Sequence, residues 1–593
     1  MSTFNPRILE ACIRDVTARL SDHQKASVLL HALDLLPAEG SRPVTENAVQ
    51  SLLRVCGLSS ANTTRALLLR AKTRLAAGYR TSAQQDLHSV LTIDPDNPDV
   101  KAVIHSQHLR PEMLLREPDG PPRFSVEVWR EIALFLPKRD LKSLLLVPHP
   151  LSRIASQLLF REIELHLTPL YEPSKMDVSF HETDVEYVDH DLDSWHYQRS
   201  ADILTRILVD PQFAGQIYSL TVHAASQDAL QSLAFQVGML LNSLSKLPNL
   251  RKAHCSGSRD LISRVVTCLH RYTPRIQRLS LELADEVFDI NIPKFKHLTH
   301  FSLFASGGDS DSVHVFVEQS RETLRALAIK NIRWHFPADA LSIRQLTHLE
   351  FSGHLSLDMF SEILSNGDQI ESLMLSGSLE CSPSSLFHQH RNSLSFLRHF
   401  HLNITSLHRQ VLDRDLCPAI SEFLRPRTQL RTYHLFIPCG EHRRIGFDAS
   451  AWGVLPALAN LRSLSMTYPS DLSSALAGWL VPRTVRALTL ELSAITTDIT
   501  SFLKQIRPGV PPLLKYVGLM LSVPIRSAVS VIEHGFPQVR VLKIGGNMWS
   551  VTRTEEGLFH VEQWPYRRVL YHTPDWLESM QCGDAVWKGV DGD

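Results

Sequence analysis

From residue 217 onward, a short hydrophobic pattern recurs along the chain. It reads apolar, two variable positions, apolar, one variable position, apolar, as in Leu324–Ile329, Leu397–Leu402 and Leu461–Met466. The thirteen instances begin at Ile217, Leu250, Ile276, Leu298, Leu324, Leu346, Ile370, Leu397, Leu430, Leu461, Val485, Leu514 and Val539. They are spaced 22 to 33 residues apart, with a mean of about 27. This regular spacing predicts one short parallel strand per turn of a solenoid.

The period is similar to that of leucine-rich repeats, which run to 20–29 residues. We therefore predict an α/β solenoid, an irregular leucine-rich-repeat horseshoe, over residues 201–557. Helical returns are expected over residues 229–247 and 261–272. The Asn ladder of regular repeats is missing, so the return segments should vary. The alternative is a doubly wound α/β sheet, which a single motif with a single period disfavours.

The third, fifth and seventh positions of each motif should point to the concave face. Seven of them are His, and His399, His401 and His434 should cluster on two adjacent strands with Phe436 beside them. The predicted face has few charges and no Arg cluster of the kind that binds phosphate, which favours a protein or peptide ligand over nucleic acid. We take these four residues as candidate substrate-binding residues and expect binding to change near pH 6.5. Alternatively, His is merely tolerated on an exposed strand face; a metal site is less favoured, because no carboxylate supports the three imidazoles.

Residues 122–168 form a compact, strongly apolar block that follows an all-α N-terminal region. Val128, Ile132 and Leu136 lie on one face of a helix that Pro137 ends. A second helix carries Leu141, Leu144 and Val147, and a third is predicted over residues 151–159. Three helices this short cannot bury all these apolar groups among themselves. The surplus should contact a partner.

This block resembles an F-box. Leu136-Pro137-x-x-Asp140-Leu141 matches the family's Leu-Pro-x-x-Asp-Leu core, and Glu127, Ile132, Leu144 and Val147 match in spacing. Phe124-Ser125, Pro148 and Leu151 depart from it. The resemblance, to F-box proteins of fungal type, implies a Skp-type adaptor and, through it, a cullin and a RING subunit. It assigns adaptor binding to Phe124, Val128, Ile132, Leu136, Pro137, Leu141, Leu144 and Val147. A chance apolar bundle is the alternative.

Residues 1–110 are expected to be helical. Two predicted helices, 66–77 and 83–91, flank a Gly78-Tyr79 corner, and Asp94-Pro95-Asp96-Asn97-Pro98 closes the second. This resembles a tetratricopeptide repeat, although a generic helical hairpin has the same pattern. One repeat cannot bury its own face, so residues 6–57 supply partner helices or the segment docks elsewhere on the chain.

Two further segments lack the repeat. Residues 169–200 are acidic and predict a flexible loop. A metal site formed by His181, Asp184, Glu186 and His190 is the less favoured interpretation, because the spacing fits no ligand motif. Residues 558–593 are rich in aromatic side chains and should form a C-terminal cap or tail over the open edge of the last strand.

Charge and motif content narrow the function. With 61 Lys and Arg against 62 Asp and Glu, the net charge is -1, which gives no electrostatic reason to expect nucleic acid or an anionic membrane as partner. Eight Cys without a Cys-x-x-Cys pair, and no signal peptide or long apolar run, favour the cytoplasm or nucleus. No hydrolase, phosphate-loop, dinucleotide or zinc-protease motif occurs, so we expect neither catalysis nor a cofactor. The leading hypothesis is the substrate receptor of an SCF-type ubiquitin ligase; a non-catalytic scaffold and an enzyme with an unfamiliar site are the alternatives.

Overall fold

The structure, a computed structural model, divides into two compact units, residues 1–124 and 125–593. The structure describes residues 20–34, 42–53, 58–76, 79–106, 126–136, 138–147, 151–167, 190–224, 234–283, 290–307, 311–337, 339, 341–493, 499–521, 528–554, 559–565, 569 and 573–587.

The first unit is helical. Its elements are α2 (Asp22–Asp34), α3 (Arg42–Leu52), α4 (Ser60–Ala76), α5 (Arg80–Ile93) and α6 (Pro98–Ser106). Helices α4 and α5 pack closely where small side chains, Ala71 and Ala83, are fully buried. Helices α2 and α3 cover the other side of α4 through Leu30, Val49 and Ala66. The partner helices that a single hairpin needs are therefore α2 and α3.

A buried ion network joins α3, α4 and α5. Asp86 accepts hydrogen bonds from Arg70 Nη2 at 2.7 Å and Arg74 Nη1 at 2.9 Å, and Arg74 Nε also lies 2.8 Å from Glu46 Oε1. Asp86 is 3% exposed. Removing it would leave two largely covered cations without this carboxylate.

We therefore expect Asp86→Ala to destabilise the first unit by about 3 kcal/mol, because breaking a buried ion pair exposes the full desolvation cost of the remaining charges. Hydrogen exchange of the α4 and α5 amides in the full chain would measure it. The control is Asp99→Ala, at an exposed position of α6. Equal amide protection in the two variants would contradict a stabilising role for this network.

The second unit begins with three short helices, α8 (Val126–Leu134), α9 (Lys138–Leu144) and α10 (Leu151–Leu159), which we call the helical block. Its small core consists of Ala133, Leu141 and Ile154, with Leu136, Leu144 and other apolar groups packed around them. Helix α10 leads directly into the first strand, where Phe160 stacks edge-on against Phe213 at 5.2 Å. The block and the sheet thus belong to one compact unit.

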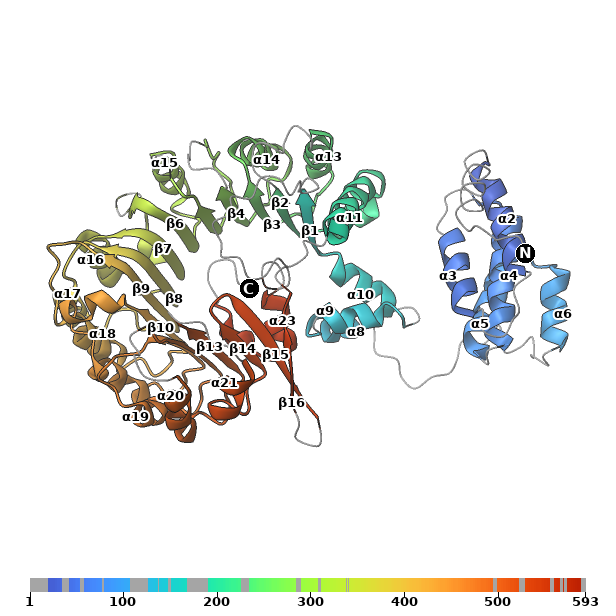
Figure 1. The fold of residues 1–593 in the computed structure, drawn as a ribbon. Helices are drawn as coiled ribbons and strands as arrows, with labels where there is room; N and C mark the ends of the chain where they lie inside the picture. The colour runs from blue at the N-terminus through green and yellow to red at the C-terminus, as the bar shows by residue number, and fades with distance from the viewer. Residues whose placement is uncertain are drawn as a thin grey trace, which may run out of the picture. The chain divides into compact units, whose positions relative to one another are not determined.

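The second unit is built on a sixteen-stranded sheet whose strands follow one another in chain order (Figure 1). Strands β1 to β14 are parallel and β15 and β16 are antiparallel. The strands are β1 (Glu162–Leu167), β2 (Ser219–Ala224), β3 (Lys252–Gly257), β4 (Arg278–Leu283), β5 (His300–Phe304), β6 (Ala326–His335), β7 (His348–Leu355), β8 (Ser372–Leu379), β9 (His399–Leu407), β10 (Thr432–Phe436), β11 (Ser463–Thr467), β12 (Ala487–Glu491), β13 (Tyr516–Met520), β14 (Val541–Ile544), β15 (Asn547–Arg553) and β16 (Phe559–Gln563). Each of the thirteen motifs begins two residues before one of β2 to β14, so the solenoid prediction is confirmed.

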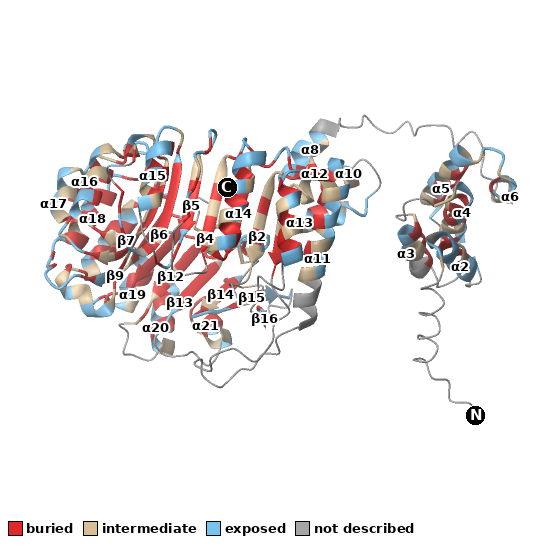
Figure 2. Cartoon of the chain, turned by 90° about the horizontal axis from the view of Figure 1, so that it is seen from above, coloured by how far each residue is buried: buried red, intermediate tan, exposed pale blue. Residues whose placement is uncertain are grey.

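Helices and 3-10 turns return the chain along the outer side of the curved sheet (Figure 1). They are α11 (His190–Val209), α12 (Pro211–Ala214), α13 (Ala234–Leu244), α14 (Arg259–Tyr272), α15 (Asp311–Ser320), η4 (Ile343–Gln345), α16 (Leu357–Asn366), α17 (Ser384–Gln389), α18 (Leu416–Leu424), η5 (Cys439–Arg444), η6 (Ala449–Ala457), α19 (Ser474–Leu480), α20 (Ile499–Ile506), η7 (Arg507–Gly509) and α21 (Ala528–His534). The core between strands and helices is continuous from Ile163 to Val551. Figure 2 shows buried strands flanked by helices whose outer faces are exposed. The mixture of α and 3-10 returns agrees with the missing Asn ladder.

Three predicted boundaries differ from the structure. Strand β1 lies inside the predicted block 122–168; Phe160, Ile163 and Leu165 have the repeat spacing, which we overlooked among the helical residues. Residues 190–200 belong to α11 and are not a loop, because α11 buries Leu204 and Ile207 against the sheet. The sheet also continues past residue 557 through β16. Residues 168–189, which hold three of the four candidate metal ligands, lie outside the described residues.

Candidate protein-binding surfaces

The helical block exposes an unusual density of large apolar side chains. Of the 24 that are exposed in the described part of the chain, seven fall within residues 128–147. These are Val128, Ile132, Leu134, Phe135, Leu145, Leu146 and Val147. Phe135 and Leu146 are the most exposed, at 87% and 89%. Scattered exposed apolar residues are ordinary, but a concentration of this kind marks a contact surface.

The structure divides the residues assigned to adaptor binding. Val128, Ile132 and Val147 are exposed, whereas Leu136, Leu141 and Leu144 pack into the core of the block. Phe124 and Pro137 lie outside the described residues. Sequence reasoning missed Phe135 and Leu146, which lie in the turns that end α8 and α9. Leu136, Leu141 and Leu144 therefore hold the block together, and the exposed residues provide the surface.

The strand register arranges the concave side chains in rows across the sheet. One row runs Ser219, Lys252, Arg278, His300, Ala326, His348, Ser372, His399, Thr432. The next row runs Thr221, His254, Ser280, Ser302, Ala328, Glu350, Met374, His401, His434. Six of the seven His predicted for this face lie in these two rows: His254, His300, His348, His399, His401 and His434.

His399, His401 and His434, which we call the His patch, do cluster. The rings of His401 and His434 lie 5.0 Å apart, and their Nδ1 atoms are 3.3 Å apart. His399 Nδ1 is 2.9 Å from Thr432 Oγ1, and the Phe436 ring is 6.1 Å from His401. The predicted arrangement is therefore present.

The His patch is not an open surface, however. The Trp587 ring lies 5.9 Å from His399, 5.4 Å from His401 and 5.3 Å from His434. His401 and His434 are 9% and 8% exposed. The expectation of a freely exposed His surface is wrong, because the chain's own C-terminal segment covers it.

Burial also changes the titration of the patch. Desolvation, with a contribution from Lys330, lowers the pKa of His401 from 6.5 to about 4. Desolvation and the neighbouring imidazoles hold the pKa of His434 well below its ordinary value. We expected a charge change near pH 6.5. In the closed structure these two rings instead stay neutral at that pH.

The C-terminal segment, residues 564–587 where described, packs on the inner side of the sheet over β12 to β14 and reaches β9 and β10 through Trp587. It contains α23 (Thr573–Ser579) and η8 (Gly583–Ala585), and Figure 1 shows α23 inside the curve. Trp564, Leu577 and Cys582 form a second core with concave side chains of β12 to β14. Lys515 Nζ donates to Gln581 Oε1 at 2.9 Å. Strand β15 pairs with β14, so the open edge is covered as well.

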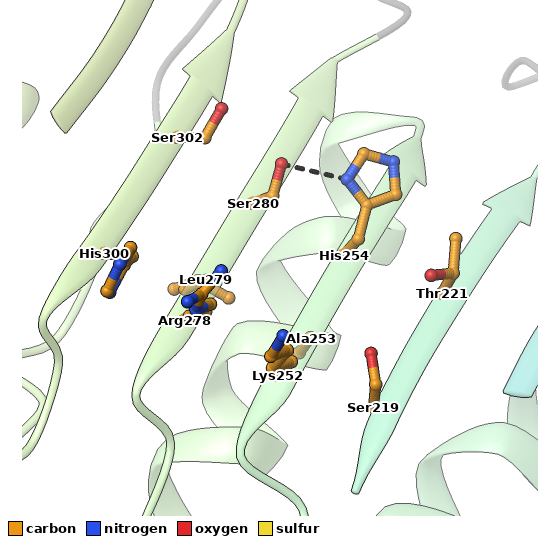
Figure 3. A pocket seen from close by; sticks show the side chains of 10 residues that line it. All are labelled: Ser219, Thr221, Lys252, Ala253, His254, Arg278, Leu279, Ser280, His300 and Ser302. Carbon is orange, nitrogen blue, oxygen red and sulfur yellow. Dashed lines mark hydrogen bonds between the residues drawn. The ribbon is translucent and has the colours of Figure 1, made fainter. Parts of the chain in front are cut away.

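A hollow remains over β2 to β5, at the other end of the face (Figure 3). It has a volume of about 250 Å³ and is lined by Ser219, Thr221, Lys252, Ala253, His254, Arg278, Leu279, Ser280, His300 and Ser302. Lys252 and Arg278 are paired in register on adjacent strands. Sequence reasoning overlooked Arg278 as a concave residue, although it holds the third position of its motif.

A second His cluster lies at the start of the sheet and was missed with β1. His166 and His223 stack at 5.1 Å, and Glu164 Oε1 lies 3.2 Å and 3.3 Å from their Nε2 atoms. Burial would raise the pKa of Glu164, but hydrogen bonds and charges from both imidazoles outweigh it and hold that pKa well below the usual range. Among the described residues no group of His, Cys, Asp or Glu is arranged to hold a metal ion.

Comparison with known proteins adds little to this geometry. No protein-family model matches the chain, and no curated protein is similar to it in sequence. Among solved structures, it is similar to the leucine-rich repeat-containing protein LegL7 from Legionella pneumophila, at 12% identity and a TM-score of 0.22, over 72% of this chain and 99% of that chain. No helix in the described ranges is long and apolar enough to cross a membrane. The strand order, register and repeat length of the second unit are themselves those of a leucine-rich-repeat-like α/β solenoid.

Proposed function

We propose that the chain is the substrate receptor of an SCF-type ubiquitin ligase. The helical block binds a Skp-type adaptor and, through it, a cullin, while the solenoid binds a protein substrate. The observation that carries the proposal is the concentration of exposed apolar side chains on the block, above all Phe135 and Leu146. It agrees with the F-box resemblance of the same block, although Phe135 and Leu146 are not among the residues to which that resemblance assigns adaptor binding.

In this function the chain supplies no catalytic group. The receptor holds a substrate near the ubiquitin-charged enzyme and so raises its effective concentration there. A receptor of this kind needs a stiff connection between its two binding surfaces. Helix α10 runs into β1 through Phe160 and Arg161, and the Arg161 carbonyl accepts hydrogen bonds from the Tyr218 and Ser219 amides at the start of β2.

The substrate surface in this proposal is the concave face over β2 to β7. The C-terminal segment occupies the other end of the face, at the His patch and over β12 to β14. The side chains over β2 to β5 are mainly polar or ionisable, as in the rim of a non-obligate interface. In this proposal the candidate substrate contacts therefore lie on this part of the sheet and not at the His patch, which Trp587 covers.

We expect Phe135→Asp/Leu146→Asp to abolish co-purification of a Skp-type adaptor with the full chain. Two buried interface anchors at about 2 kcal/mol each correspond to roughly a thousandfold loss of affinity. Because both side chains are exposed in the free chain, the thermal unfolding profile should not change.

The matched control is Val315→Asp/Leu357→Asp, two exposed apolar positions on α15 and α16. It should co-purify the adaptor like the unmodified chain. Leu136→Asp/Leu141→Asp should also lose the adaptor, but through unfolding of the helical block. Undiminished capture by Phe135→Asp/Leu146→Asp would contradict the proposal and favour a scaffold in which the block only caps the solenoid.

A further inference from the structure

We propose that a second hollow, at the turns that lead into β9 and β10, is a binding site for a phosphate group. It has a volume of about 190 Å³ and lies where the chain returns to the sheet after α17 and α18 (Figure 1). We call it the loop hollow, and it is lined by Arg391, Asn392, Ser395, Leu397, Pro426, Arg427, Thr428 and Gln429. Neither its residues nor its test involve the helical block, so this proposal and the receptor function can fail separately.

The first support is the place of Arg427 in its repeat. Arg427 lies three residues before the motif that begins at Leu430, and the Leu430 amide donates to the Arg427 carbonyl at 3.0 Å. The same backbone hydrogen bond recurs in other repeats, for example from Leu250 to Leu247. Seven other repeats have a buried apolar residue at this position: Ala214, Leu247, Phe295, Ile343, Leu394, Leu458 and Phe536. A charged side chain here is therefore a departure that the solenoid itself does not require.

The second support is that the Arg427 guanidinium is buried without a negative partner. Arg427 is only 6% exposed. Its Nη2 donates to the backbone carbonyls of Arg391, at 3.1 Å, and Ser393, and the group lies 3.4 Å from the centre of the Phe423 ring. Its Nε and Nη1 are buried with no hydrogen-bond partner in the described part of the chain. Buried charges are normally paired, so an anion from outside the chain would account for this one.

Burial leaves this cation charged. Desolvation lowers the pKa of Arg427 from 12.5 to about 10, which is still well above neutral pH. The carbonyls and the Phe423 ring hold the guanidinium in place, but they supply no net negative charge. Because the group is covered from water, its charge is screened less in the loop hollow than the charge of a surface arginine would be.

The third support is the set of donors that line the rest of the loop hollow. Arg391 is exposed, and its side chain has no ion pair within the described residues. Four further exposed side chains add amide and hydroxyl groups: Asn392, Ser395, Thr428 and Gln429. None of the eight lining residues is Asp or Glu. These exposed groups can donate hydrogen bonds to an anion directly, and Arg427 adds its charge from within the structure.

The donor set indicates the kind of anion. Two guanidinium groups on separate turns, with hydroxyl and amide donors between them, suit a group that accepts hydrogen bonds from several directions. A phosphate group has at least three strong acceptor oxygens, whereas a carboxylate has two, and Arg is well suited to bind phosphate. Carboxylates on the neighbouring elements have other partners, since Glu422 lies 3.4 Å from His388 and Glu371 lies 3.3 Å from Arg398. A phosphate group is therefore the ligand that we assign to the loop hollow.

The test is ligand-observed ³¹P NMR of inorganic phosphate mixed with the full chain at constant ionic strength. We expect saturable broadening of the phosphate signal. Arg427→Leu and Arg391→Gln should each weaken phosphate binding at least about tenfold, because each removes a charge-assisted interaction. Arg427→Leu should melt at an unchanged or higher temperature, since replacing a buried charge by the apolar residue of other repeats is often neutral or stabilising. Arg391 is exposed, so the effect of Arg391→Gln reports binding and not folding.

The source of the phosphate group follows from a second ligand, a phosphoserine peptide with glycine flanks, which has its own ³¹P signal. Tighter binding of the peptide than of inorganic phosphate would assign the group to a phosphorylated protein. Tighter binding of inorganic phosphate would assign it to the free ion. Both results support a phosphate site.

The matched control is Arg425→Gln, which removes the same charge at an exposed position two residues from Arg427 and outside the lining of the loop hollow. It should bind phosphate like the unmodified chain. The absence of saturable broadening with the unmodified chain, an equal loss in Arg425→Gln, or displacement of phosphate by an equal concentration of acetate would overturn the proposal. A lower melting temperature of Arg427→Leu together with unchanged phosphate binding by Arg391→Gln would also overturn it, and would make Arg427 a structural support for the turn before β9.

Discussion

Leu327→Asp should unfold the second unit. Leu327 is fully buried on β6, and its register partners are Phe301 on β5 and Leu349 on β7, both also buried. A carboxylate there would enter the core that successive repeats share. A buried unpaired charge costs at least about 4 kcal/mol, a large fraction of the stability of an ordinary domain.

The measurement is the solubility and thermal unfolding of the full chain. Phe304→Asp is the matched control, because Phe304 lies on neighbouring β5 but points to the concave face and is 44% exposed. We expect the control to unfold at the same temperature as the unmodified chain. A soluble Leu327→Asp variant with an unchanged unfolding curve would contradict the shared core.

Acidification from pH 7 to pH 5 should release Trp587 from the His patch. We call the His patch closed when Trp587 covers it, as in the structure, and opened when Trp587 is released. In the closed form the pKa of His401 is about 4, whereas a solvent-exposed imidazole titrates near 6.5. Below pH 6.5 the opened form therefore binds more protons than the closed form, and the stability of the closed form falls as pH falls toward 4. At pH 5 His401 alone contributes about 2 kcal/mol toward opening, and His434 acts in the same direction.

The geometry of the two rings explains why protonation destabilises the closed form. His401 and His434 face each other through their Nδ1 atoms at 3.3 Å, a distance at which one ring donates and the other accepts. A second proton would set two N–H groups against each other. His401 Nε2 is also buried without a hydrogen-bond partner among the described atoms. Charging either ring therefore favours an opened patch.

The ¹⁹F NMR signal of Trp587 in the 5-fluorotryptophan-labelled chain, assigned with Trp587→Phe, would follow the release. We expect its chemical shift to move to the value of a solvent-exposed tryptophan between pH 7 and pH 5. The double variant His401→Asn/His434→Asn should remove this pH dependence. His408→Asn, at an exposed position of the same repeat, should keep it. A signal that does not change over this range would contradict the linkage between burial and titration.

The sequence predicts the solenoid well because each strand carries its own local signal. Motifs such as Leu324–Ile329 alternate buried and concave side chains, and the strand register follows from repeating them. β1 was missed because it is one instance of the motif within helical sequence. The start of α11 was not predicted, because the acidic composition of residues 169–200 indicates a loop.

The candidate sites were predicted less well, because exposure depends on contacts that no local pattern contains. Phe135 and Leu136 are adjacent apolar residues, yet the turn at the end of α8 exposes the first and packs the second into the core. The clustering of His401 and His434 followed from register alone. Its burial depends on Trp587, which comes from 153 residues beyond His434 in the chain, and no sequence spacing predicted that contact.

Light scattering after size-exclusion chromatography of the purified full chain mixed with a purified Skp-type adaptor tests the proposed receptor function most directly. We predict a stable one-to-one complex for the unmodified chain, and separate adaptor and receptor peaks for Phe135→Asp/Leu146→Asp. Separate peaks for the unmodified chain, at concentrations well above those at which Skp-type adaptors bind their receptors, would contradict adaptor binding through the helical block.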